Sequence, residues 1–161
     1  MTKEQFKTLF DLYFDDIRRY LYYRCGDTSI STDLAQDTFM RIWEKQMDLQ
    51  PDRDTGLLYK IAGDLFVSHT RRERLRKESP ELIRFEQRDS TPEDELQYRD
   101  LQEKYEKVLM KLPENQRVVF LMSRTEELTY QEIATRLSIS VKAVEKRISG
   151  ALSRLRKELR T

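Results

Sequence analysis

The stretch LTYQEIATRLSISVKAVEKRI, residues 128–148, decides the fold of the C-terminal part of the chain. Thr129 and Glu132 have the T-x-x-E spacing of a capping box, which predicts a helix that begins directly after the threonine. The Ser-Ile-Ser that follows is too short for anything but a turn, and Ser140 suits the N-cap of a second helix. Such a turn favours Gly where Ser138 stands, because a positive φ costs less there.

Apolar residues define the buried faces of the two expected helices. They are Ile133, Ala134 and Leu137 in the first helix, and Val144, Ile148, Leu152 and Leu155 in the second. A helix fits the major groove of DNA, where Lys and Arg bond to guanine acceptors and Glu accepts from cytosine. The candidates for DNA contact are therefore the polar and small residues beside the second stripe: Ser140, Lys142, Ala143, Glu145, Lys146, Arg147 and Ser149. A plain helical hairpin with a solvated basic face is the alternative.

The composition favours a helical protein with a large surface. Of 161 residues, 37% are charged and 38% hydrophobic, and only 4 Gly and 4 Pro are present, which argues against an all-β fold. The net charge of +1 hides two blocks of opposite sign. Residues 129–161 carry eight Lys/Arg against three Glu, whereas residues 78–106 carry ten Asp/Glu against four Lys/Arg. A basic C-terminal block fits a nucleic-acid partner.

The sequence lacks the motifs that mark several classes of function. One Cys and one His cannot build a metal cluster or an intrachain disulfide, and there is no Gly-rich phosphate loop. We therefore expect no cofactor, no metal, no small-molecule substrate and no enzymatic activity. No apolar run approaches the length of a membrane span, and the N-terminus has no signal-peptide pattern, so we expect a cytoplasmic protein without membrane insertion.

Helical periodicity continues through most of the remaining chain. It predicts helices at residues 4–24, 32–47, 56–76, 92–111 and 114–124, with Thr2 and Gln5 spaced as a capping box before the first. The acidic, proline-containing residues 78–91 lack periodicity and predict a linker. We expect an all-α protein with two small helical domains, a three-to-four-helix bundle at 1–77 and a helix-turn-helix domain at 92–161.

Three stretches together resemble a known family. Residues 112–159, LPENQRVVFLMSRTEELTYQEIATRLSISVKAVEKRISGALSRLRKEL, look like region 4 of bacterial sigma factors of the extracytoplasmic-function (ECF) group. DLAQDTFMRIWEK, residues 33–45, resembles the core-binding helix of region 2 of that group. GLLYKIAGDLFVSHTRRER, residues 56–74, resembles the helix that follows it, which melts the promoter and recognises the minus-10 element. The order and spacing match over nearly the whole chain.

The resemblance implies a sigma factor that binds core RNA polymerase, through the β′ clamp and the β flap, and directs it to promoters. It also implies a minus-35 contact by the C-terminal helix-turn-helix and an anti-sigma factor as a further partner. It implies that the polymerase clamp contacts the polar side of the second helix, at Asp33, Gln36, Asp37, Arg41 and Glu44.

The minus-10 element and its phosphates are expected to contact the third helix and the loop before it. The residues concerned are Arg53, Lys60, Asp64, His69, Arg71 and Arg72. Basic side chains neutralise phosphates, and basic grooves hold opened single strands. Tyr59 and Phe66 have rings that can stack on bases, but their positions favour the core. The sequence departs from the family at Gly63-Asp64, where Arg-Asn is frequent.

Two other interpretations stay open at this point. The first is a helix-turn-helix transcriptional regulator whose helical N-terminal domain senses a signal or dimerises. The second is a helical enzyme or adaptor in which both basic blocks only confer solubility. Tight duplex binding by the free protein would favour the regulator, and the absence of any nucleic-acid affinity would favour the adaptor.

Overall fold

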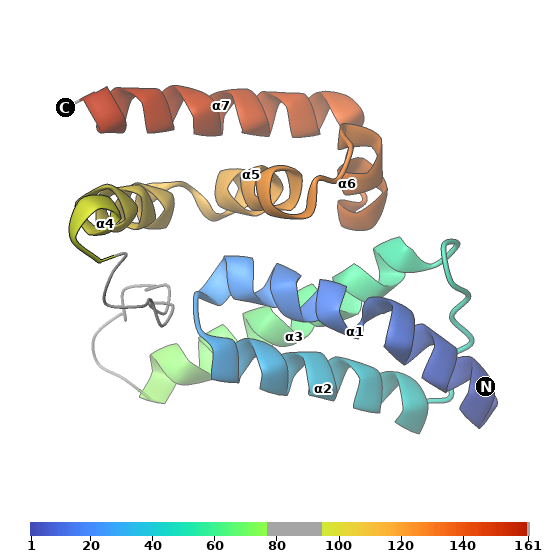
Figure 1. Cartoon of the computed structure of the whole chain (residues 1–161). Helices are drawn as coiled ribbons and strands as arrows, with labels where there is room; N and C mark the ends of the chain where they lie inside the picture. Colours follow the sequence, from blue (N-terminus) through green and yellow to red (C-terminus); the bar gives the residue numbers. More distant parts are fainter. Residues whose placement is uncertain (77–94, 161) are drawn as a thin grey trace.

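The structure is a computed structural model that describes residues 1–76 and 95–160, with side chains described for 1–76 and 102–160. Within these ranges every regular element is an α-helix (Figure 1). The helices are α1 Lys3–Cys25, α2 Thr28–Glu44, α3 Thr55–Arg76, α4 Glu95–Lys111, α5 Glu114–Glu126, α6 Tyr130–Leu137 and α7 Val141–Arg160. The all-α prediction is confirmed. The expected linker 78–91 and the expected helix start at residues 91–92 lie outside the described residues.

Helices α1, α2 and α3 form the N-terminal bundle. The predicted capping box opens α1, because the backbone N–H of Gln5 donates to Thr2 Oγ1 at 3.1 Å and the backbone N–H of Thr2 donates to Gln5 Oε1 at 2.9 Å. The core of the bundle combines apolar side chains of all three helices, which are Leu9, Ile17 and Leu21 of α1, Phe39 and Ile42 of α2, and Leu58, Ala62 and Phe66 of α3.

The predicted start of the second helix at residue 32 is wrong, since α2 begins at Thr28. Gly26 ends α1 with φ 70°, and Asp27 directly after it is the N-cap of α2, where its side chain accepts from the backbone N–H of Ile30 at 3.0 Å. Only these two residues separate the helices, because a left-handed C-cap and an N-cap need one residue each. The helix also ends at Glu44, before Gln46 with φ 50°, and not at residue 47.

Helices α4 to α7 form the C-terminal domain, and its helix-turn-helix agrees with the sequence. Thr129 and Glu132 form the expected capping box of α6. Ser138 has φ 56°, so serine occupies the left-handed position that favours glycine. The backbone N–H of Ala143 donates to Ser140 Oγ at 3.0 Å, which confirms the expected cap of α7.

One expected core residue of α7 faces solvent. Leu152 is 37% exposed, while Ala151 is fully buried between Ile148 and Leu155. The reason is the helical period, since seven residues fall about 20° short of two full turns and eight overshoot them by about 80°. From Val144, position 151 therefore stays on the buried face and position 152 leaves it.

The two halves pack against each other. Helix α1 contacts α5, and α3 contacts α6, whereas α7 crosses α5 and α4 on the side away from the bundle (Figure 1). The first three helices and the last four, although separated along the chain, thus share one interface. Among the described residues, no helix is both long and apolar enough to cross a membrane.

Candidate nucleic-acid interface

Helix α7 presents the expected DNA-contacting residues on the outside of the molecule. Lys142, Glu145, Lys146 and Ser149 are exposed, as is Ser140 before the helix, while Ala143 and Arg147 are half-buried. In Figure 1 this helix lies along the edge of the molecule farthest from α2 and α3. All seven candidates therefore lie on or beside one helix that is open to a large partner.

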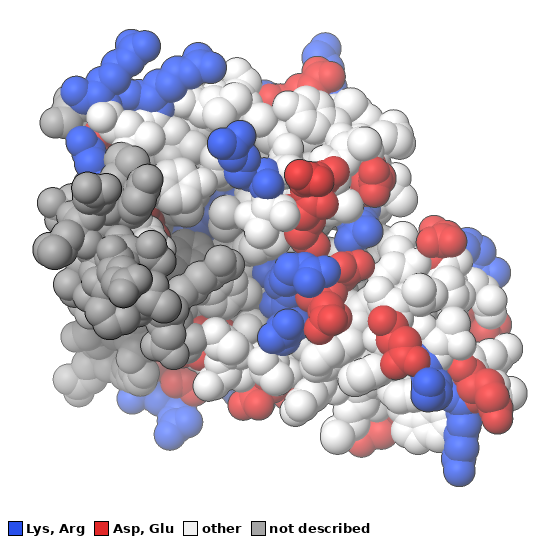
Figure 2. Space-filling model, viewed as in Figure 1, with Lys and Arg blue, Asp and Glu red and all other residues white. Residues whose placement is uncertain are grey.

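The opposite face of α7 is held by close packing. Val144 is fully buried and Ile148 is 5% exposed, and both lie in the same core as Ile133 and Ala134 of α6. In the turn, the backbone N–H of Ile139 donates to the carbonyl oxygen of Ala134 at 3.0 Å. The polar face is thus carried on a rigid two-helix unit, with further basic side chains gathered toward the C-terminal end of α7 (Figure 2).

The residues expected at the minus-10 element fall into two groups along α3. Lys60 and Asp64 are exposed in the first half of the helix and line a cavity of about 300 Å³. Arg71 and Arg72 are exposed near its end, and His69 before them is half-buried. The structure therefore brings Lys60 and Asp64 together and leaves the basic end of the helix apart from them.

Two further predictions on this surface can be compared with the structure. Tyr59 is 2% exposed and Phe66 7%, which confirms that both rings belong to the core. Arg53 is exposed in the loop before α3, and its guanidinium donates to Asp54 Oδ2 at 2.9 Å. This pairing lowers the pKa of the Asp54 carboxyl group.

The polar side of α2 is open to solvent. All five residues expected to contact polymerase are exposed, namely Asp33, Gln36, Asp37, Arg41 and Glu44. Met40 lies among them and is 56% exposed, a feature that was not predicted from the sequence. The sequence did contain a signal for it: Met40 is apolar but does not fall on the helical period of the buried residues of α2. An apolar residue on the polar side of a helix is a candidate for contact with a partner.

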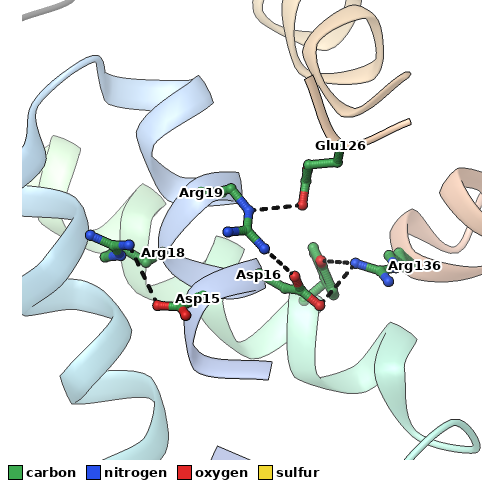
Figure 3. A network of polar contacts seen from close by, with 7 residues as sticks. Asp15, Asp16, Arg18, Arg19, Glu126 and Arg136 are labelled. Carbon is green, nitrogen blue, oxygen red and sulfur yellow. Dashed lines mark hydrogen bonds and ion pairs between the residues drawn. The ribbon is translucent and has the colours of Figure 1, made fainter. Parts of the chain in front are cut away.

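A group of charged and polar residues joins the two halves, and we call it the interdomain polar cluster: Asp16, Arg19, Tyr59, Glu126 and Arg136 (Figure 3). Arg19 donates to Asp16 Oδ1 at 2.6 Å and to Glu126 Oε1 at 3.1 Å. Arg136 donates to Asp16 Oδ2 at 3.2 Å and to the Tyr59 hydroxyl oxygen at 2.9 Å. Asp16 is therefore shared by an arginine of each half.

The cluster is partly removed from water. The side chains of Glu126, Arg136 and Asp16 are 8%, 17% and 18% exposed. Burial raises the pKa of the Glu126 carboxyl group, although its bond with Arg19 acts in the opposite direction. Burial likewise raises the pKa of Tyr59. The cluster was not predicted from the sequence because its partners are 107 and 120 residues apart, so no local spacing marks them.

The geometry defines a helical protein in which α7 exposes a polar face suited to a DNA groove, α3 ends in basic residues and α2 exposes a polar side. Comparison with known proteins agrees. The family model described as sigma-70 region 2 matches residues 9–76, and the model described as sigma-70, region 4 matches residues 102–155. Together they cover most of the chain, which therefore belongs to the sigma-70 family and is a promoter-directing sigma factor.

Individual relatives agree with this assignment and place the chain in the ECF group of the family. The chain is 27% identical to the ECF RNA polymerase sigma factor SigW of Bacillus subtilis, over 98% of this chain and 90% of SigW. It is 28% identical to the ferric citrate uptake sigma factor FecI of Escherichia coli, over 91% of this chain and 86% of FecI. Among solved structures, the sigma factor RpoE of Bartonella quintana, crystallised with the anti-sigma factor NepR, shares the fold with a TM-score of 0.65 and 24% identity, over 97% of each chain.

Proposed function

We propose that this sigma factor recognises the minus-35 element with α7, recognises and melts the minus-10 element with α3, and binds core RNA polymerase through α2. The observation that carries the proposal is the division of α7 into a buried apolar face and an exposed face with Lys142, Glu145 and Lys146. A rigid helix with this division can enter the major groove and place its side chains at base edges.

At the minus-10 element the two groups on α3 have different roles. Arg71 and Arg72 neutralise phosphates, which supplies affinity that falls with salt but carries no sequence information. Lys60, Asp64 and Arg53 lie at the other end, where an unstacked base can be held by a basic pocket. His69 lies between the two groups on the same helix. In this scheme the free energy of promoter binding opens the duplex, and no ATP hydrolysis is needed.

The polymerase contact uses the open side of α2. Asp33, Asp37 and Glu44 are carboxylates spaced so that a charged helical surface, such as the polymerase clamp, can pair with them. Met40 in their midst supplies an apolar anchor of the kind that concentrates binding energy at an interface. The C-terminal domain contacts the polymerase flap, and the molecule acts in the cytoplasm without enzymatic activity of its own.

An anti-sigma factor completes the set of partners. Support comes from the fold shared with RpoE of Bartonella quintana, whose structure was solved with the anti-sigma factor NepR. Such a partner would withhold the sigma factor from polymerase until a signal releases it.

Reconstituted transcription tests the proposal. Purified protein is mixed with core RNA polymerase of the same organism and a pool of promoter-region DNA, and transcript starts are sequenced. We expect starts that depend on the added protein and share two spaced elements upstream. Tight duplex binding by the protein alone, without binding to core polymerase, would contradict the proposal and favour an ordinary helix-turn-helix regulator.

A further inference from the structure

The loop between α2 and α3, residues 45–54, carries Arg53, a candidate contact of the minus-10 element (Figure 1). Its backbone is left-handed at Asp52, where φ is 66°. Aspartate adopts this conformation more readily than most residues other than glycine, but still at a cost in conformational free energy. Such a backbone persists only where the surrounding structure holds it.

The side chain that holds Asp52 comes from α1, 39 residues away in the sequence. The Tyr13 hydroxyl donates to Asp52 Oδ1 at 3.0 Å, and the backbone N–H of Asp52 donates to the Tyr13 hydroxyl oxygen at 2.9 Å. Tyr13 is only 6% exposed, so its ring is fixed in the core of the bundle. Burial also raises the pKa of its hydroxyl group, which therefore keeps the proton that it donates. We call these two bonds the loop tether.

The rest of the loop is ordered around the neighbouring Asp54. Its Oδ2 accepts from the backbone N–H of Gln50 at 2.7 Å and from Arg53 Nε at 3.1 Å. The backbone N–H of Asp54 donates to the carbonyl oxygen of Gln50 at 3.0 Å, and the side chain of Leu49 is buried. The hydrogen bonds of Asp54 lie within the loop and fix its shape, whereas the loop tether joins that shape to α1.

The order of this loop matters because the loop leads directly into α3. The side chain of Arg53 is 65% exposed and lies just before the first residue of that helix, Thr55. A segment that is already ordered loses less conformational entropy when DNA binds, and a contacting side chain must be held to within about 0.5 Å. Tyr13 itself is buried with its hydroxyl bonded in both directions, so it acts through the loop and not by contact with DNA.

We propose that Tyr13 is a positioning residue for minus-10 recognition, because the loop tether holds Asp52 in its left-handed conformation and thereby places Arg53 against the opened strand. The proposal rests on the proposed function of α3 and of Arg53. Loss of the hydroxyl frees the loop to adopt other conformations. The contact with the minus-10 element then weakens, whereas the contact of α7 with the minus-35 element is unchanged.

The variant Tyr13→Phe tests the loop tether, because it removes only the hydroxyl group. Core polymerase reconstituted with each variant is titrated with two DNA probes, a single strand with the non-template minus-10 element and a duplex with only the minus-35 element. The transcript starts of the wild type define both elements. We expect Tyr13→Phe to weaken binding of the minus-10 strand roughly five- to thirtyfold and to leave binding of the minus-35 duplex unchanged.

Thr38→Val is the matched control for the loss of a buried hydroxyl. Thr38 is fully buried in the same bundle, and its hydroxyl donates to the carbonyl oxygen of Leu34, within α2, at 2.7 Å. An equal loss of minus-10 binding in Thr38→Val would overturn the proposal, since Tyr13 would then serve only the stability of the bundle. Unchanged binding by Tyr13→Phe would overturn it too. A wild type that binds neither element would contradict the proposed function, and the loop tether with it.

Two variants of Asp52 test the left-handed residue itself. Asp52→Asn keeps an acceptor for the Tyr13 hydroxyl and tolerates the left-handed backbone, whereas Asp52→Ala does neither. We expect Asp52→Asn to bind the minus-10 strand as the wild type does, and Asp52→Ala to bind it at least as weakly as Tyr13→Phe. An equal loss in both variants of Asp52 would overturn the proposal.

The coupling of Tyr13 to Arg53 separates positioning from a general effect on folding. The double variant Tyr13→Phe with Arg53→Ala is compared with the two single variants on the minus-10 strand. Because the loop tether acts through Arg53, we expect Tyr13→Phe to change binding by no more than about twofold once Arg53 is replaced. An undiminished effect of Tyr13→Phe in the Arg53→Ala protein would overturn the proposal.

Discussion

The buried guanidinium of Arg117, on α5, donates a hydrogen bond to the backbone carbonyl oxygen of Tyr23, on α1, at 2.8 Å. It also donates to the carbonyl oxygen of Arg24 at 3.0 Å and to that of Leu112 at 3.4 Å. The last carbonyls of a helix lack partners within it and carry partial negative charge. A side chain of the C-terminal domain therefore caps the first helix of the N-terminal bundle.

Replacement of Arg117 tests this cap. Arg117 is 2% exposed, and burial lowers the pKa of its guanidinium, so its bonds to carbonyl oxygens must offset the cost of a buried charge. We expect Arg117→Met to reduce the free energy of unfolding by about 1–3 kcal/mol, because buried carbonyls lose their donors. Urea denaturation of the wild type and the variant measures this change in the free energy of unfolding. Arg124→Met, at an exposed position of the same helix, is the control, and an equal loss there would contradict the cap.

The proposed role of α7 in reading the minus-35 element makes a prediction about sequence preference. We expect Lys146→Ala and Arg147→Ala each to cost about 1–3 kcal/mol of promoter binding by the polymerase complex and to relax the preference at one position of the minus-35 element. Binding to a library of variant promoters measures both effects. Lys157→Ala, near the end of α7, is the control. If both substitutions weaken all promoters equally, these side chains contact phosphates.

The basic end of α3 makes a prediction about salt. Removing one side chain that neutralises a phosphate should reduce the slope of log binding constant against log salt concentration by about 0.7–0.9. We therefore expect Arg71→Ala with Arg72→Ala to reduce this slope by roughly 1.4–1.8 without changing base preference. Titrations at several salt concentrations measure it, with Lys7→Ala of α1 as the control. An unchanged slope would show that Arg71 and Arg72 do not contact phosphates.

The open face of α2 makes a prediction about polymerase affinity. We expect Asp37→Lys to weaken binding to core polymerase by about 1–2 kcal/mol, or about five- to thirtyfold in Kd, because a paired carboxylate becomes a like charge. Met40→Ala should weaken it by a similar amount, because the apolar anchor is then absent. Asp11→Lys, at an exposed position of α1, is the control for net charge. Equal effects at Asp11 and Asp37 would place the polymerase contact elsewhere.

Glu126 makes a prediction about pH. Its carboxyl pKa is raised above the ordinary value of 4.5 by burial. Between 4.5 and the raised value the folded protein binds more protons than the unfolded chain, so the free energy of unfolding falls as pH rises through this window. We expect Glu126→Gln to remove that fall in urea titrations over the window. Glu127→Gln, its exposed neighbour, should keep it, and an unchanged pH slope in Glu126→Gln would contradict the raised pKa.

Much of the fold could be predicted because its determinants are local. Capping boxes at Thr2 and Thr129 mark helix starts through residues three apart, and the 3.6-residue period places Val144 and Ile148 on a buried face. The end of one helix and the start of the next are harder to tell apart when their capping residues are adjacent in the sequence. Gly26 ends one helix and Asp27, the next residue, caps the start of the following one, so the break between them is only two residues long. Ala151 takes the core position expected for Leu152 because the helical period outweighs side-chain size.

The sequence by itself determined most of the helices, the basic polar face of the last helix and the family resemblance, since these depend on residue types at short fixed spacings. Only the tertiary structure decided that the halves close on one another. Asp16, Arg19 and Arg136 look like ordinary solvated charges in the sequence, and Arg117 looks like an interruption of an apolar run. Their partners lie about 90 to 120 residues away, and a contact over such a separation is set by how whole helices pack.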